Sequence, residues 1–153
     1  MRRLLLIAAT LAASWLATQA VHEAGHVLAA WATGGQVARV VLHPLEISRT
    51  ELSANPRPLL VAWAGPLAGV AAPLALWALA LHRRWSTAPL MRFFAGFALA
   101  ANGLYLGLGS LRGMGDAGDL LRHGAPPWQL WLFGAVASAA GLALWHGQGR
   151  HFG

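Results

Sequence analysis

Cysteine and lysine are both absent from this chain of 153 residues, so every one of its eleven basic residues is an arginine. Without cysteine the chain can form no disulfide bond and no metal site with thiolate ligands. A metal ion would therefore need histidine and carboxylate ligands. Charged residues of either sign are scarce as well, at 10% of the chain, whereas ordinary soluble domains carry about 25%.

Hydrophobic residues take the place of the missing charges. They make up 57% of the chain, and its mean hydropathy is +0.52. So little polar surface cannot keep a globular protein dissolved in water, and we therefore expect the lipid bilayer to be its partner and solvent. The arginines lie mostly between the apolar runs and form no basic stripe, so we expect no nucleic-acid partner.

Four apolar runs are long enough to cross a bilayer, which takes about 20 helical residues. We therefore predict an all-α polytopic membrane protein that forms a single integral-membrane domain over residues 1–153. The four predicted helices cover residues 4–33, 59–81, 93–111 and 128–145. After the first helix, β-branched residues alternate on either side of His43-Pro44-Leu45, which predicts a small β-hairpin over residues 36–52.

The first run has two interpretations. Arg2-Arg3, the apolar residues that follow and Thr18-Gln19-Ala20 are also typical of a signal peptide with a small-residue cleavage site. The apolar pattern, however, continues to Trp31 without a turn signal, which is longer than the usual signal-peptide core of about 7–15 residues. We therefore favour an uncleaved helix.

The strongest local signal of chemistry is the sequence His22-Glu23-Ala24-Gly25-His26, which lies toward the end of the first predicted helix. Residues four apart share one face of a helix, so both imidazoles can bind one metal ion with Glu23 beside them. A catalytic zinc ion takes three protein ligands and a water molecule, and Glu23 would take the proton of that water. The alternative is that these are polar residues where a helix end meets the membrane surface.

A third ligand is expected after the third predicted helix. If four segments span the bilayer, the carboxyl ends of the first and third helices face the same side. Asp116 follows the third helix and Asp119 lies three residues later, so either or both carboxylates can point at the histidines. In the alternative interpretation, the two aspartates form a polar turn or cap a helix.

Three further features have interpretations that stay open. Small residues four apart in Gly65-Pro66-Leu67-Ala68-Gly69 favour close helix packing, with a backbone role near the substrate as the alternative. Asn102 is an isolated amide in an apolar helix, so it is expected to hydrogen-bond across helices or to approach the site. His43 is expected to be a turn residue, with a place near the metal as the alternative.

Taken in order, the His-Glu-Ala-Gly-His motif, the strand-rich loop, Ala64-Gly65-Pro66-Leu67, Asn102 and the aspartates resemble the site-2 protease group of intramembrane metallopeptidases, the M50 peptidases. The resemblance covers about residues 15–122. It implies that Asp116 is the third ligand, because the Asp-Gly-Gly motif of the family aligns best with Asp116-Ala117-Gly118. It also implies that the hairpin pairs with an unwound substrate by strand addition.

We therefore predict an intramembrane zinc metalloprotease (a zinc metalloendopeptidase) that cuts transmembrane protein substrates. Zn²⁺ would be held by His22, His26 and Asp116, with Asp119 as the alternative third ligand and Glu23 as the catalytic base. A catalytically inactive scaffold that binds zinc and transmembrane segments is the second hypothesis, and a metal carrier is the third. Glu23 argues against the scaffold, because metal binding alone does not need it.

The arginines leave the orientation in the membrane open, because six lie on the side of the amino terminus and five on the other. The Arg2-Arg3 pair favours an amino terminus inside the cell, whereas the family resemblance favours one outside. A composition rich in arginine, alanine, glycine and tryptophan is typical of GC-rich bacterial genomes. We therefore expect a multi-pass protein of the bacterial inner membrane.

Overall fold

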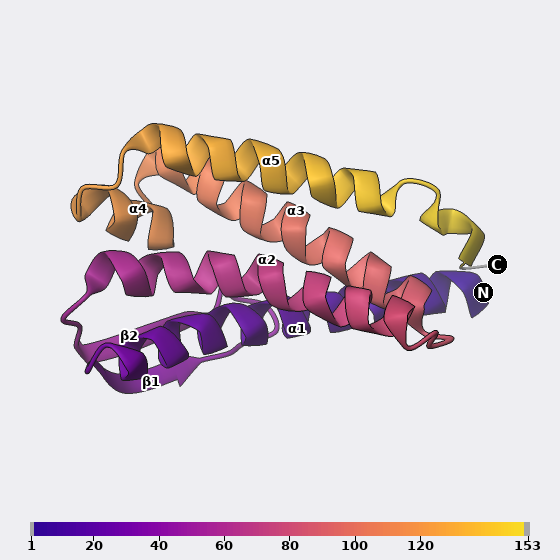
Figure 1. The fold of residues 1–153 in the computed structure, drawn as a ribbon, viewed down its shortest axis with the longest axis horizontal. Coiled ribbons are helices and arrows are strands. Elements are labelled where there is room, and N and C mark those ends of the chain that lie inside the picture. Colours follow the sequence, from indigo (N-terminus) through magenta and orange to yellow (C-terminus); the bar gives the residue numbers. More distant parts are fainter. Residues whose placement is uncertain (1, 152–153) are drawn as a thin grey trace.

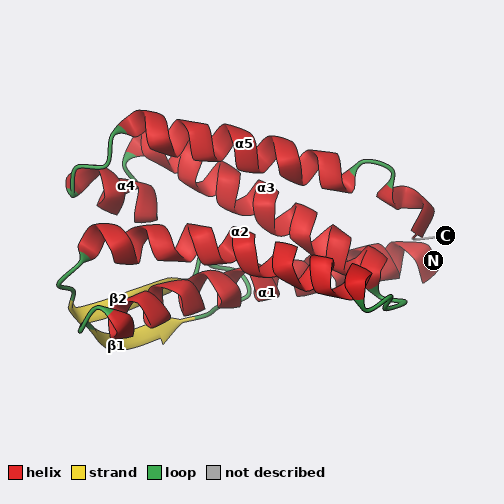
Figure 2. Cartoon of the chain, in the orientation of Figure 1, coloured by secondary structure: helices red, strands yellow, loops and turns green. Residues whose placement is uncertain are grey.

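The computed structural model describes residues 2–151, which form mainly helices. The helices are α1 (Arg2–Ala32), α2 (Pro58–His82), α3 (Ala88–Arg112), α4 (Gly115–Arg122), α5 (Pro127–Trp145) and a final 3₁₀ helix, η1 (Gln148–His151). The strands β1 (Gln36–Val41) and β2 (Arg49–Ala54) pair antiparallel (Figure 2). The predicted fold class, helical with a small hairpin after the first helix, is confirmed.

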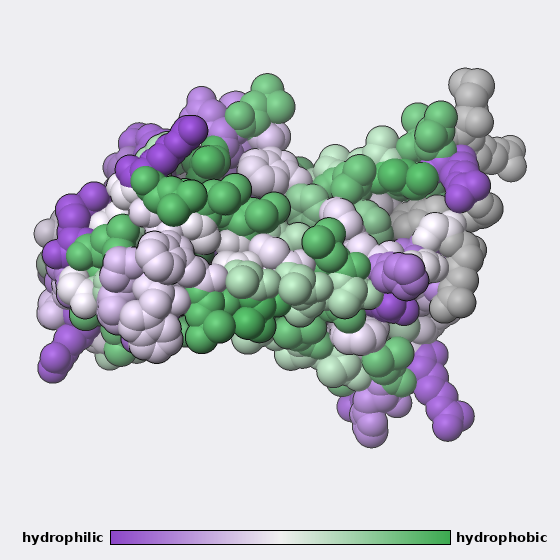
Figure 3. Space-filling model, turned by 90° about the horizontal axis from the view of Figure 1, so that it is seen from above, coloured by the Kyte–Doolittle hydropathy of each residue, from purple (hydrophilic) through white to green (hydrophobic). Residues whose placement is uncertain are grey.

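Four helices in the described part of the chain, α1, α2, α3 and α5, are long and apolar enough to cross a membrane. They form an elongated bundle in which successive long helices run in opposite directions (Figure 1). The hairpin and α4 lie at one end of this bundle, and η1 lies at the other, near the start of α1. On the face shown in Figure 3, hydrophilic residues gather toward the two ends and hydrophobic residues between them, as a bilayer requires.

The observed helix boundaries lie within two residues of the predicted ones except at the start of α3. Both α2 and α3 carry a proline in the first turn, where its missing N–H breaks no helical hydrogen bond and its fixed φ favours the helix. Because Pro89 starts the helix, α3 begins at Ala88 instead of residue 93. The connection between α2 and α3 is therefore shorter than predicted.

The short helix α4 was not predicted, because the residues between the third and fourth long helices contain glycines, prolines and aspartates. The chain enters α4 through Gly113 and Gly115, whose φ angles of 61° and 55° favour glycine. Ala117 and Leu120 of α4 are fully buried in a cluster with side chains from α2, α3 and α5. A helix of two turns is unstable alone, so this buried cluster is what stabilises it.

The hairpin lies against α1 and is attached to it by polar contacts. Trp15 Nε1 donates a hydrogen bond of 2.8 Å to the carbonyl oxygen of Pro44, and Gln19 Nε2 donates one of 3.4 Å to that of His43. The turn side chains point away, since Leu45 is 87% exposed. The turn between the strands is therefore held by hydrogen bonds and not by a buried apolar core.

These contacts bear on the two interpretations of the first segment. α1 is one continuous helix from Arg2 to Ala32. Cleavage after Ala20 would remove Trp15 and Gln19 and, with them, both contacts to the turn. The uncleaved helix stays a prediction, and the hairpin contacts support it.

Candidate metal centre

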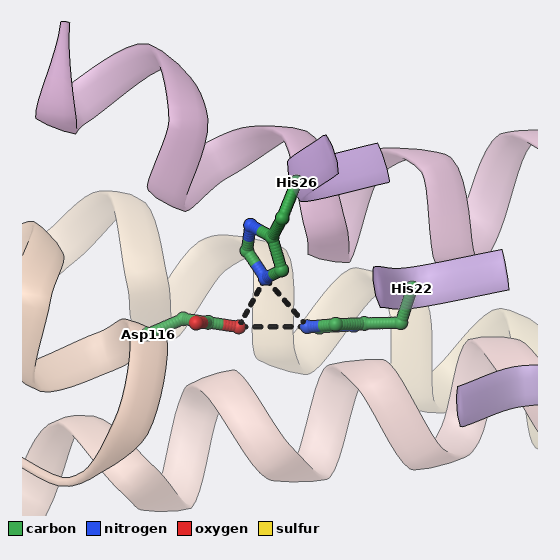
Figure 4. A group of neighbouring side chains, drawn as sticks. All are labelled: His22, His26 and Asp116. Carbon is green, nitrogen blue, oxygen red and sulfur yellow. Dashed lines mark hydrogen bonds and ion pairs between the residues drawn. The ribbon is translucent and has the colours of Figure 1, made fainter. Parts of the chain in front are cut away.

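Three side chains from α1 and α4 converge on one point inside the bundle. His22, His26 and Asp116 each offer one ligand atom, and these atoms all lie within 4.8 Å of one another. His22 Nε2 lies 2.7 Å from Asp116 Oδ2 and 3.1 Å from His26 Nε2, and His26 Nε2 lies 3.3 Å from Asp116 Oδ2 (Figure 4). The histidines are buried, and the aspartate side chain is 16% exposed.

The second ring nitrogen of each histidine faces an oxygen atom that accepts a hydrogen bond. His22 Nδ1 donates to Asn102 Oδ1 and His26 Nδ1 donates to the carbonyl oxygen of Val61, each at 2.7 Å. Asn102 Nδ2 donates to the carbonyl oxygen of Ala98, so its Oδ1 is the atom that faces the ring. Both Nδ1 atoms therefore carry a proton, and in the neutral rings both Nε2 atoms present a lone pair to the shared point.

These three groups fit a zinc ion. Two Nε2 lone pairs and a carboxylate oxygen at such short range repel one another unless a cation, either a metal ion or an added proton, lies among them. A four-coordinate zinc ion with bonds of about 2.0–2.1 Å separates its ligand atoms by about 3.3 Å. The separations of 3.1 and 3.3 Å from His26 Nε2 are close to this value, and the 2.7 Å between His22 Nε2 and Asp116 Oδ2 is shorter. Two histidines and one carboxylate are also a ligand set that zinc takes in catalytic sites.

Asp116 is held at this point as an anion. Burial is the largest single influence on the pKa of its carboxyl group and raises it, but the hydrogen bonds and charge interactions with His22 and His26 together outweigh burial, so the pKa lies well below its ordinary value. The Asp116 backbone N–H also donates to the Tyr105 hydroxyl at 3.3 Å. A Cβ atom on Gly115 would overlap that hydroxyl, which explains the glycine before Asp116.

Glycines of α2 make room for the site. A Cβ atom on Gly65 would overlap the imidazoles of His22 and His26, and one on Gly69 would lie 2.6 Å from the amide nitrogen of Asn102. The sequence favoured helix packing for this pair of small residues. The structure shows close packing, and the groups packed against α2 are the polar side chains of the site.

The Glu23 side chain is turned toward the hairpin. It is 3% exposed; its Oε1 accepts a hydrogen bond of 2.6 Å from Ser48 Oγ, and its Oε2 accepts one of 2.6 Å from Thr50 Oγ1. Thr50 lies in β2 and Ser48 lies one residue before that strand, and both hydroxyls reach the same carboxylate. These hydrogen bonds offset the cost of a carboxylate within an apolar bundle.

The remaining candidates lie apart from the converging group. Asp119 also lines the cavity, but its carboxylate forms an ion pair with Arg122, so the structure brings Asp116 and not Asp119 to the histidines. His43 Nδ1 accepts a hydrogen bond from the Leu45 N–H at 3.2 Å, which is a contact within the turn. His43 therefore has the place expected of a turn residue.

His22, His26, Asp116 and Glu23 all line one cavity of about 560 Å³. Its walls come from α1, the hairpin, α2, α3 and α4. Several of the side chains that line it are apolar. The apolar lining residues include Trp15, Ile47, Leu52, Val61 and Ala62. Sites that bind ligands have volumes of about 300–1,000 Å³, so the cavity has room for a short stretch of peptide.

Sequence reasoning found Asn102, which was expected to bond across helices or approach the site and does both. It missed Ser48, Thr50 and Tyr105 as polar partners. The spacing of two between Ser48 and Thr50 signals a shared face, but no local pattern says which helix that face meets. Val61 acts through its main-chain carbonyl, which leaves no signal in the side-chain sequence.

A family model described as Peptidase M50B-like matches residues 4–107, which is more than half of the chain. No curated protein and no solved structure matches the chain. The matched segment contains the two histidines, the hairpin and α2, and it ends before Asp116. Together with the four long apolar helices, this match identifies a multi-pass integral membrane protein.

Proposed function

The chain belongs to the M50B-like peptidase family, and from that premise we propose that it is an intramembrane zinc metalloprotease that hydrolyses peptide bonds of membrane-embedded substrates. The observation that carries this proposal is the convergence of Asp116 with His22 and His26 in the cavity that Glu23 also lines. Asp116 lies beyond the segment matched by the family, so its position supports the proposal independently of the match.

In the proposed mechanism His22, His26 and Asp116 would hold the zinc ion, while Asn102 and the carbonyl group of Val61 orient the imidazoles. When bound, the ion supplies Lewis-acid activation of a water molecule and of the scissile carbonyl group. Glu23 accepts the proton of the attacking water and passes it to the amine nitrogen of the leaving group.

The proposed substrate is a transmembrane segment that unwinds locally. Within the described residues β1 and β2 form a two-stranded sheet, so each strand has one edge without a strand partner. Thr50 and Leu52 of β2 line the cavity, so an extended segment added beside β2 would lie near the metal ligands. The proposed location is the bacterial inner membrane.

The test is zinc-dependent cleavage in proteoliposomes, using tagged single-pass peptides in which a Gly-Pro pair is stepped through the membrane segment. We expect cleavage of at least one peptide and a rate about 10²–10⁴-fold lower for Glu23→Gln, because the base is lost. Zinc per chain should not change in this variant, because Glu23 is not among the converging ligand atoms.

Glu46→Gln is the matched control, since Glu46 is an exposed acid of the hairpin turn. It should cleave at the wild-type rate. If zinc-loaded wild-type protein cleaves no peptide of the series, the protease proposal fails and a zinc-binding scaffold replaces it. Equal rates for wild type and Glu23→Gln would refute the role of the base alone.

A further inference from the structure

One face of α1 carries three polar side chains a helical turn apart, and all three bind the hairpin. Trp15 and Gln19 donate to main-chain carbonyl groups of the turn at 2.8 and 3.4 Å. Glu23 accepts from Ser48 and Thr50, each at 2.6 Å. The two shortest of these four hydrogen bonds therefore join the hairpin to the carboxylate of the site.

The two hydroxyls fix both oxygens of the Glu23 carboxylate without blocking either. Each carboxylate oxygen offers two lone pairs, and each hydroxyl hydrogen bond uses one of them. One lone pair on each oxygen stays available to accept a proton. A glutamate side chain without such partners would sample several rotamers, since its torsions are otherwise free.

We propose that Ser48 and Thr50 are positioning residues, whose hydroxyls hold the Glu23 carboxylate in the orientation in which it takes the proton of the attacking water. The inference rests on the proposed role of Glu23 as general base. It also links two parts of the reaction, because β2, the strand proposed to receive the substrate, and the residue just before it carry the two hydroxyls that orient the base. Substrate pairing and base placement therefore depend on the same segment, residues 48–50.

The kinetic test removes both hydroxyls in the double variant Ser48→Ala/Thr50→Val, in which valine keeps the shape of threonine. With a peptide that the wild-type protein cleaves, we expect kcat to fall about 10–100-fold, as for the loss of other outer partners of a site. KM should stay within about twofold, and zinc per chain should be unchanged. The conservative variant Thr50→Ser keeps a hydroxyl and should retain a kcat close to that of the wild type.

Ser53→Ala is the matched control. Ser53 lies on the same strand, but its hydroxyl donates to the main-chain oxygen of Gln36 and not to the site. A double variant with the kcat of Ser53→Ala would overturn the inference, and so would a Thr50→Ser variant as impaired as Thr50→Val. A loss of zinc or of thermal stability together with kcat would show a structural role instead, which also overturns it.

A second measurement tests the contact without any activity. Trypsin can cut after Arg49, which lies between the two hydroxyl residues, when the hairpin opens in detergent. We expect Glu23→Ala and the double variant to speed this cut about tenfold relative to the cut at Arg83-Arg84, because hydrogen bonds to a charged group are lost. An unchanged rate of this cut in both variants would overturn the inference, because the contact would then not hold the hairpin. The result does not depend on whether the protein cleaves the test peptides, so it is distinguishable from a failure of the protease proposal.

Discussion

α4 and the hairpin both bring a polar group to the site, but they are held in opposite ways. α4 is anchored by apolar side chains, since Ala117 and Leu120 are fully buried in the cluster with α2, α3 and α5. The hairpin turn is anchored by hydrogen bonds to α1, and its apolar side chain Leu45 is 87% exposed. The proposed metal ligand Asp116 thus comes from the element held by buried apolar side chains, and the hydrogen-bond partners of the proposed base come from the less deeply buried one.

This difference fits the roles proposed for the two elements. The three ligand atoms must stay within a few tenths of an ångström of their places for a metal ion to bind. An element that pairs with an unwound substrate has to adjust when the substrate arrives. Close-packed apolar cores resist displacement, whereas a few hydrogen bonds at the edge of a cavity can exchange partners.

The largest effect should come from the ligand on α4. Asp116→Ala removes one of three ligands, so the affinity for zinc should fall by more than the about 10–100-fold that outer partners contribute. Asp119→Ala should bind zinc as the wild type does, because Asp119 pairs with Arg122 outside the converging group. Competition with a chelator, read as zinc per chain in detergent, measures both. Equal losses in the two variants would show that α4 presents the wrong face in this structure.

The second-largest effect should be on stability, and it should differ between α4 and the hairpin turn. Leu120→Ala leaves a cavity in a fully buried cluster and should lower the free energy of unfolding by about 2–5 kcal/mol, with weaker zinc binding because α4 loosens. Leu45→Ala, in the hairpin turn, should change it by less than about 0.5 kcal/mol. Unfolding in mixed micelles with increasing SDS measures both variants. A Leu45→Ala variant as unstable as Leu120→Ala would remove the contrast.

The smallest effect should be electrostatic and confined to the hairpin. Glu51 accepts hydrogen bonds from Arg39 at 2.9 Å and from Arg49 at 3.0 Å, and these lower its pKa below the ordinary 4.5. A lowered pKa in the folded state stabilises the hairpin above the ordinary value, and that stabilisation is lost as the pH falls through the lowered pKa.

Hydrogen exchange of the hairpin amides measures this contribution. Near pH 7, exchange in Glu51→Gln should be faster than in the wild type by at most a few-fold, because exposed ion pairs contribute little. The two proteins should converge only well below pH 4.5. A difference that persists in strong acid would mean that the carboxyl group acts through packing and not through its charge.

Much of the fold could be predicted because it depends on short stretches of sequence. A bilayer span is set by the length and hydropathy of one segment, so three of the four long helices were placed within two residues at both ends. The hairpin was found from alternation around a turn. α4 could not be predicted, because a two-turn helix takes its stability from contacts with other helices, through residues such as Ala62 of α2 and Leu106 of α3.

The sequence by itself determined that the chain has a bilayer for its solvent and that His22 and His26 share one helix face with Glu23 beside them, because composition and a spacing of four act locally. The family resemblance favoured Asp116 over Asp119, but only the tertiary structure shows that Asp116 meets the histidines, 94 residues from His22 along the chain. The tertiary structure alone decided that Ser48 and Thr50 meet Glu23, 25 and 27 residues away. These choices depend on how α4 packs against α2 and α3 and on how the hairpin packs against α1. Packing between distant segments leaves no period in the sequence, which is the physical reason that it had to be seen in three dimensions.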